Sequence, residues 1–235
     1  MKNMKILTLI LMSFAINLCF SQKIKIEYII KNDSLPKKEK RDFFYLAKET
    51  DIANAKYIGR LKATNKFSYI DMAIYLLKDQ AQKKGANSFK FVEFKNGNGI
   101  NELIIDTYVI GDEIKRTNQY NLPKNKIYFF GKDNLEKETI EEYSLNDELK
   151  KIKSFHYAIV EFDKPMKIAK GKVFGTTLKV KPNENGDSLF INFSGFGASS
   201  TSTPTGGIGI GLSGGNVIQM DSNYGLLLTN IYKQE

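Results

Sequence analysis

The chain has 235 residues, 42% of them hydrophobic, and a formal net charge of +9 at pH 7. A chain of this length can bury a hydrophobic core without stabilisation by disulfide bonds or a bound metal ion. The one cysteine, Cys19, lies in a leader-like segment, so the chain beyond it has no thiol nucleophile and no cysteine-ligated metal; we expect no cofactor and no metal.

Residues 1–21 have the pattern of a signal peptide. Lys2 and Lys5 give a positive start, and residues 6–16 form an apolar run too short for a stable membrane span. Cys19 and Ser21 are small residues at the −3 and −1 positions. We therefore expect cleavage between Ser21 and Gln22, followed by export to the periplasm, the outer surface or the medium.

The alternative is a lipoprotein signal that uses Cys19. That signal prefers a small residue just before the cysteine, and here the position holds Leu18. Simple secretion is therefore favoured over lipidation. No second apolar run is long enough to cross a bilayer, so we expect no transmembrane span in the mature chain.

The basic charge comes almost entirely from lysine. Only Arg41, Arg60 and Arg116 are arginines, and the lysines are scattered among acidic residues. Phosphate recognition favours arginine forks, so the composition indicates a solvated basic surface rather than a nucleic-acid interface. A weak attraction to an anionic surface is the alternative.

The first half, residues 22–118, is predicted to be an α+β domain. The clearest helix, 68–87, has apolar residues at helical spacing, Ser68 as a cap and Gly85 as a stop. A strand precedes it, and two strands joined by the turn "NGNG" follow it, which gives a strand–helix–strand–strand unit. The expected strands are 23–31, 55–64, 88–95 and 102–110, and a further helix is expected at 37–50.

The second half, residues 125–235, is predicted to be an antiparallel β-sandwich or a partly open β-barrel. The polar segment that precedes it, 112–125, indicates a linker, which we place at 119–124. Many short apolar runs separated by turn residues are typical of such folds. The expected strands lie at 126–130, 139–145, 155–162, 172–180, 188–196, 207–212, 216–220 and 224–232.

The strand "AKYIGRLKA", the helix end "AQKKGAN" and the strand "SFKFVEF" resemble small domains of bacterial envelope lipoproteins of the stress-sensing type. The resemblance covers residues ~55–110, and it implies signalling or partner binding rather than catalysis. Residues ~124–235, opening with "KIYFF", more faintly resemble β-rich bacterial envelope domains of unknown function. That second resemblance implies no site residues.

The stretch "GIGIGLSGG", 207–215, contains a G-x-G-x-x-G pattern from Gly209 to Gly214. A dinucleotide loop opens a helix and has an acid about 20 residues later, whereas Asp221 follows Gly214 by only a few positions. We therefore predict a strand at 207–212, with Ile208, Ile210 and Leu212 toward the core. The preceding residues, 195–206, are predicted to be a long flexible loop.

The sequence contains no clear set of catalytic residues. His156 is the only histidine, so a structural role is predicted for it. The carboxylate pairs Glu141/Glu142 and Glu161/Asp163 raise the alternative of a glycan or peptide hydrolase. Glu141 and Glu142 are adjacent on a strand and face opposite ways, so solvated acids at strand ends are the favoured interpretation.

Two short motifs, Asp33-Ser34-Leu35 and Asp187-Ser188-Leu189, resemble O-glycosylation sites of Bacteroidota. Ser34 and Ser188 are thus candidate modification sites, although turn chemistry explains both equally well. Together these observations predict an exported, non-catalytic binding or structural module of a bacterial envelope, whose partner is an envelope protein or a glycan. An extracellular hydrolase that uses carboxylates of the second half is the alternative.

Overall fold

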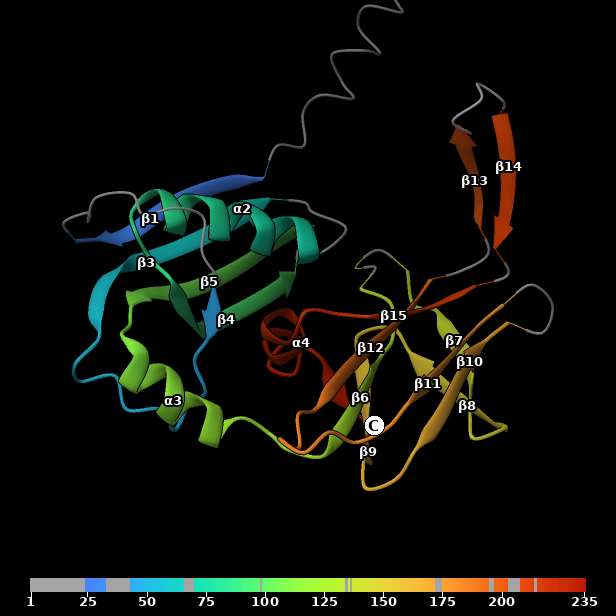
Figure 1. Cartoon of the computed structure of the whole chain (residues 1–235). Helices are drawn as coiled ribbons and strands as arrows, with labels where there is room; N and C mark the ends of the chain where they lie inside the picture. The colour runs from blue at the N-terminus through green and yellow to red at the C-terminus, as the bar shows by residue number, and fades with distance from the viewer. Residues whose placement is uncertain are drawn as a thin grey trace, which may run out of the picture.

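The computed structural model describes residues 24–32, 43–65, 70–97, 99–133, 135, 137–171, 175–194, 197–202, 208–213 and 215–235, with only the backbone described in 197–202 and 208–213. The predicted leader, its cleavage site at Ser21 and Gln22, and Ser34 lie outside these residues. The predicted α+β class is confirmed: strands dominate, three helices occur in the described part, and the sheets are not closed into a barrel (Figure 1).

A five-stranded sheet with the order β1-β3-β5-β4-β2 forms the first half. Its strands pair antiparallel, except that β2 runs parallel to β4. The predicted β4–β5 hairpin is confirmed. The elements are β1 (Lys25–Lys31), β2 (Phe44–Tyr45), β3 (Lys56–Asn65), α2 (Ile70–Lys83), β4 (Ser88–Gly97), β5 (Ile100–Val109) and α3 (Asp112–Asn121).

The two helices lie on opposite faces of this sheet (Figure 1). Ile70, Ala73, Leu77 and Ala81 recur at helical spacing along α2 and are all buried against one face. On the other face, Ile114 of α3 joins a small cluster with Leu46, Tyr108 and Ile110. Successive side chains of β3 and β5 point to opposite faces, so these two strands contribute residues to the clusters on both sides of the sheet.

Two further sheets form a sandwich in the second half. One has the order β15-β12-β6-β9-β16 and the other β11-β10-β7-β8. The pairs β12–β6 and β16–β9 are parallel, so the expectation of an all-antiparallel sandwich is wrong there. The strands are β6 (Lys126–Phe130), β7 (Ile140–Leu145), β8 (Glu148–Lys153), β9 (His156–Glu161), β10 (Met166–Lys170), β11 (Thr176–Val180), β12 (Leu189–Ser194), β15 (Asn216–Gln219) and β16 (Lys233–Gln234).

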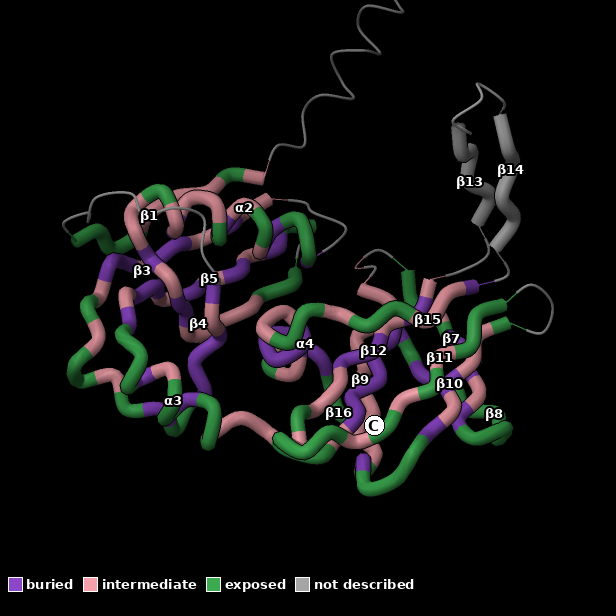
Figure 2. Tube along the Cα trace, in the orientation of Figure 1, coloured by how far each residue is buried: buried purple, intermediate pink, exposed green. Residues whose placement is uncertain are grey.

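The sheet β15-β12-β6-β9-β16 packs against a core on each of its faces, which explains the near-continuous apolar sequences of β6 and β12. In β6, Ile127 and Phe129 pack into the sandwich core, whereas Tyr128 and Phe130 join the core beneath α2. Successive side chains of a strand point to opposite faces, so one strand serves two cores. Figure 2 marks the buried positions along β3, β5, β6 and β12.

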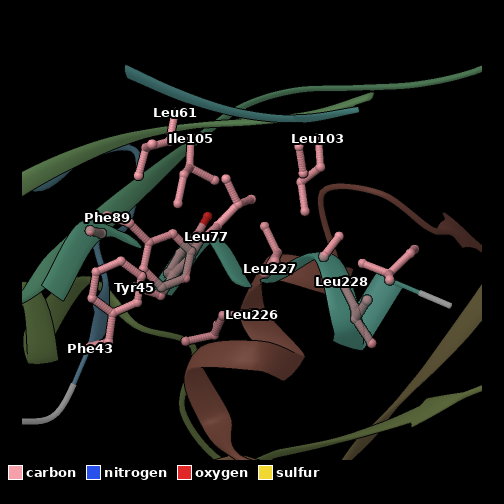
Figure 3. Close-up of a cluster of buried hydrophobic side chains, with 14 of the residues drawn as sticks. Phe43, Tyr45, Leu61, Leu77, Phe89, Leu103, Ile105, Leu226, Leu227 and Leu228 are labelled. Atoms are coloured by element: carbon pink, nitrogen blue, oxygen red, sulfur yellow. The ribbon is translucent and has the colours of Figure 1, made fainter. Parts of the chain in front are cut away.

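The last helix, α4 (Ser222–Leu228), corrects the predicted strand at 224–232. The Asp221 side chain accepts a hydrogen bond from the Tyr224 backbone amide at 3.1 Å, which caps the helix. Four consecutive residues, 225–228, are buried, because the helix end inserts into the core (Figure 3). Leu227 and Leu228 of α4 belong to the same cluster as Leu77 of α2 and Leu103 of β5, so the core under α2 includes both halves of the chain.

Three other expectations are corrected. Phe44 and Tyr45 form β2, and the described part of the predicted helix 37–50 is not helical. Helix α3 occupies most of the stretch expected to be an irregular linker, and only 122–125 connect it to β6. Residues 197–202 of the predicted loop form β13 (Gly197–Ser202), which pairs with β14 (Ile208–Ser213). The division of the chain into domains at 119–124 stays a prediction.

Candidate functional site

A cleft of about 530 Å³ lies where the two halves of the chain meet. This volume is within the range of ligand-binding clefts, roughly 300–1,000 Å³. Its walls come from β2, α3, the connection after α3, the turn before β12, and the segment from β15 into α4. The residues that line it are Phe44, Lys115, Asn118, Gln119, Leu122, Pro123, Lys124, Asn183, Asp187, Ser188, Leu189, Phe190, Gln219, Met220, Ser222, Asn223 and Leu226.

Two asparagines fix the wall formed by β2. The Asn223 side chain of α4 accepts a hydrogen bond from the Tyr45 amide at 2.8 Å. The buried Asn118 side chain of α3 donates to the Tyr45 carbonyl at 2.8 Å and accepts from the Ala47 amide at 2.9 Å. These side chains satisfy backbone groups at the outer edge of β2, which would otherwise stay open as a sheet edge.

The opposite wall is a turn closed by its own polar side chains. Asn183 accepts from the Asp187 amide at 2.9 Å and donates to the Asp187 carboxylate at 3.0 Å. The candidate glycosylation residue Ser188 is half-buried here, and its hydroxyl donates to the Pro123 carbonyl at 2.9 Å while accepting from the Lys126 amide at 3.2 Å. Glycosylation of Ser188 stays a prediction, and any glycan there would compete with both bonds.

Three further polar side chains of the cleft are neutral. Gln119, Gln219 and Ser222 are exposed, and their side chains make no hydrogen bond to another described residue. Both lysines of the cleft are paired: Lys115 Nζ lies 3.3 Å from the Asp112 carboxylate, and Lys124 Nζ lies 3.3 Å from that of Asp187. The cleft therefore offers unpaired amides and a hydroxyl beside paired charges.

Leu122, Leu189 and Met220 give the cleft apolar surface, each of them partly buried. Phe44 adds a half-buried ring, and Lys115 Nζ lies 5.1 Å from its centroid. A cation over an aromatic face is a weakly stabilising contact that holds both side chains in place. Apolar surface with a few convergent polar groups is the usual lining of a ligand site.

The four carboxylates considered for hydrolysis lie elsewhere, and three of them are paired with lysines. Glu142 and Glu161 are exposed and lie 2.9 Å and 2.7 Å from the ammonium groups of Lys151 and Lys126. Asp163 is exposed in the loop after β9. As expected, Glu141 and Glu142 face opposite sides of β7, but the expectation that Glu141 is solvated is wrong.

Glu141 is buried, with 7% of its side chain exposed, and it pairs with both Lys170 and Lys132. Burial raises the pKa of this carboxyl, but the two ion pairs outweigh burial and the net pKa is lowered. Lys170 also donates to the Glu142 carbonyl at 2.9 Å and lies over the Phe193 ring. The group is thus a buried, satisfied ion cluster that joins β7 to β10.

His156 begins β9 and is half-buried. Its Nδ1 lies 2.8 Å from the Ser154 carbonyl, so this nitrogen donates a hydrogen bond to it. The residue lines an open hollow of about 540 Å³ with Ile140, Lys151 and Glu235, among others. In the part of the chain that the structure describes, no group of three His, Cys, Asp or Glu residues can hold a metal ion, and no helix is long and apolar enough to cross a membrane.

Asp133 bridges the halves of the chain. Its carboxylate accepts hydrogen bonds from the Ile70 backbone amide at the start of α2 and from the Tyr224 hydroxyl of α4, the latter at 3.5 Å. Burial and the nearby Asp71 raise its pKa to about 6, against the effect of these hydrogen bonds. The Tyr232 hydroxyl is buried without a partner among the described residues, and burial raises the pKa of Tyr232.

The glycine-rich stretch is a strand, as predicted, from Ile208 to Ser213. It pairs antiparallel with β13, and these two strands form a sheet of their own. Strand geometry at Gly209 and Gly211 is incompatible with a loop that opens a helix around phosphate. The predicted inward direction of Ile208, Ile210 and Leu212 falls outside the described side chains.

Comparisons of the chain with family profiles, with curated proteins and with solved structures found no match. The site therefore has to be argued from its own geometry.

The cleft escaped the sequence analysis because its residues are ordinary surface types. The adjacent Asn118 and Gln119 lie far along the chain from Gln219 and Asn223, and amides of this kind carry no spacing signal. The one available signal was Asp221, an N-cap residue followed three positions later by Tyr224. It indicates a helix at 222–228, which is what brings Asn223 into contact with β2.

Proposed function

We propose that this chain is an exported, non-catalytic binding module of a bacterial cell envelope, with its ligand site in the cleft between α3 and α4. One observation carries the proposal: the cleft combines apolar surface with unpaired neutral polar groups contributed by both halves of the chain. The leader-like segment 1–21 and the resemblance of residues ~55–110 to envelope lipoprotein domains support the compartment.

The hydrolase alternative has less support. Glycosidases use two carboxyl groups that flank the bond to be cleaved, and one of them carries a raised pKa. Of the acids considered for that role, Glu141 has a lowered pKa and two lysine partners. Glu161 is exposed and paired with Lys126. Neither lines the cleft.

Turnover assays separate the two functions. Labelled neutral and acidic oligosaccharides and short peptides are incubated with the purified exported chain, and the products are followed by mass spectrometry. A binding module returns every compound intact, for wild type and for Glu141→Gln alike. Cleavage by wild type that is abolished in a folded Glu141→Gln protein would establish the hydrolase instead.

Fractionation of native cells, with intact-mass measurement of the recovered protein, tests the compartment. The proposal predicts a periplasmic, surface or extracellular protein whose mass fits cleavage before Gln22. A mass increase that fits a diacylglycerol group would indicate Cys19 lipidation, and one that fits sugars would indicate glycosylation, for which Ser34 and Ser188 are the candidate sites. Recovery of the uncleaved chain in the cytoplasm would contradict the proposal.

A further inference from the structure

We propose that the cleft between α3 and α4 takes a short, neutral oligosaccharide. This inference rests on the proposed function and adds the chemical class of the ligand. It follows from three properties of the cleft: its unpaired groups are uncharged, its lysines are paired with carboxylates, and the edge of β2 beside it is closed.

The unpaired groups match sugar hydroxyls. The side-chain amides of Gln119 and Gln219 each have an NH₂ group that donates and a carbonyl oxygen that accepts. The Ser222 hydroxyl can both donate and accept a hydrogen bond. Every hydroxyl of a sugar likewise donates and accepts. A ligand rich in hydroxyls can therefore satisfy all three side chains, whichever way each of them rotates.

The charges of the cleft disfavour an anionic ligand. A phosphate, sulfate or carboxylate gains most from an unpaired cation, and here Lys115 and Lys124 are paired with Asp112 and Asp187. The net positive charge of the chain thus does not extend into the site as free cationic groups.

An extended peptide is disfavoured at β2 because the edge of that strand is occupied. Peptides that add to a sheet depend on free main-chain donors and acceptors. Along β2 these groups bond to the side chains of Asn118 and Asn223. The apolar side chains of Leu122, Leu189 and Met220 remain available to the carbon–hydrogen faces of a sugar ring.

Titration calorimetry of the purified exported chain tests the class. The probes are neutral trisaccharides of glucose, mannose and N-acetylglucosamine, a sulfated trisaccharide, and an uncharged hexapeptide. Gln119→Ala and Gln219→Ala remove exposed side chains, so both variants should keep the fold. Gln234→Ala removes an exposed glutamine outside the cleft and serves as the matched control.

We expect one or more neutral trisaccharides to bind, with a dissociation constant raised about tenfold in each cleft variant and unchanged in Gln234→Ala. Binding of only the sulfated sugar or only the peptide, weakened by the same variants, would overturn the ligand class and leave the cleft as the binding site. Binding of no probe, or binding that the cleft variants leave unchanged, would overturn the ligand class and the proposed site together.

Discussion

Asp133 and Glu141 are both carboxylates removed from most of their water, and their neighbours drive their pKa values in opposite directions. Asp133 faces backbone and tyrosine donors and another acid, whereas Glu141 faces two lysines. The sequence predicts that Glu141 and Glu142 point apart, because strand geometry is local. It does not predict Lys170 as a partner, since that contact depends on the pairing of β7 with β10.

Protonation of Asp133 should stabilise the fold. Its pKa of about 6 lies above the ordinary value of 3.8, so the native state holds the proton more tightly than the unfolded chain. Its contribution is fully present below about pH 4 and is lost as the pH rises through about 6, with an upper limit of about 3 kcal/mol. Chemical unfolding of wild type and Asp133→Asn across this range measures the step.

We expect the step to vanish in Asp133→Asn and to persist in Asp163→Asn, which changes an exposed acid. A wild-type profile that Asp133→Asn leaves untouched would show that Asp133 does not hold its proton in the native state.

Removal of the Glu141 charge should be costly. In Glu141→Gln the Lys170 ammonium, whose side chain is 11% exposed, loses its carboxylate, and removal of one partner of a buried ion pair destabilises by about 3–5 kcal/mol. The matched change Glu142→Gln, on the exposed side of the same strand, should cost less than about 1 kcal/mol. Urea unfolding at pH 7 compares them. Equal costs for the two variants would contradict the buried ion cluster.

Elements with a clear hydrophobic period were predicted correctly. Helix α2 shows apolar residues at helical spacing, and β4 and β5 alternate around a glycine turn. The run "GLLL" has no period, and a short apolar run fits a strand or a buried helix equally well. Its helical state depends on core space beside Phe190 that only the folded chain provides.

Strand β8 was missed for a related reason. Its lysine-rich sequence reads as polar because five of its six residues are exposed at a sheet edge. The preceding Asn146 and Asp147 both have positive φ, 50° and 68°, as in the tight turns of two-residue hairpins. That asparagine–aspartate pair was a usable signal for a β7–β8 hairpin.

Gly225→Ala tests the packing of α4. Alanine favours helix over glycine by about 1 kcal/mol, so an exposed site would gain stability. Here a Cβ would lie 2.3 Å from a Phe190 ring carbon, and overpacking of this kind costs about 1–3 kcal/mol. We expect a net loss, measured as a lower midpoint of thermal unfolding. A higher midpoint would mean that α4 does not rest on Phe190.

At the scale of the whole molecule, the core beneath α2 joins the two halves. Leucines of α4, near the end of the chain, pack with residues of α2 and β5 (Figure 3). Sequence reasoning places a boundary at 119–124 because composition changes there, and composition does not reveal contacts between distant segments. Because the two halves share this core, we expect them to unfold together.

Leu227→Ala tests this coupling. Removal of a fully buried leucine costs about 2–5 kcal/mol. Native-state hydrogen exchange should then show faster opening of β3 and β5 in the first half as well as β6 and β12 in the second. Loss of protection in only one half would support two independently folding domains.

NMR chemical shifts of the chain with a bound neutral trisaccharide locate the ligand on the fold. We expect the largest changes on backbone amides of α3 and of the segment from Gln219 to Asn223, with little change at His156 or along β8. Changes centred on the hollow beside His156, or on the face that carries Glu142, would contradict the assignment of the cleft as the binding site.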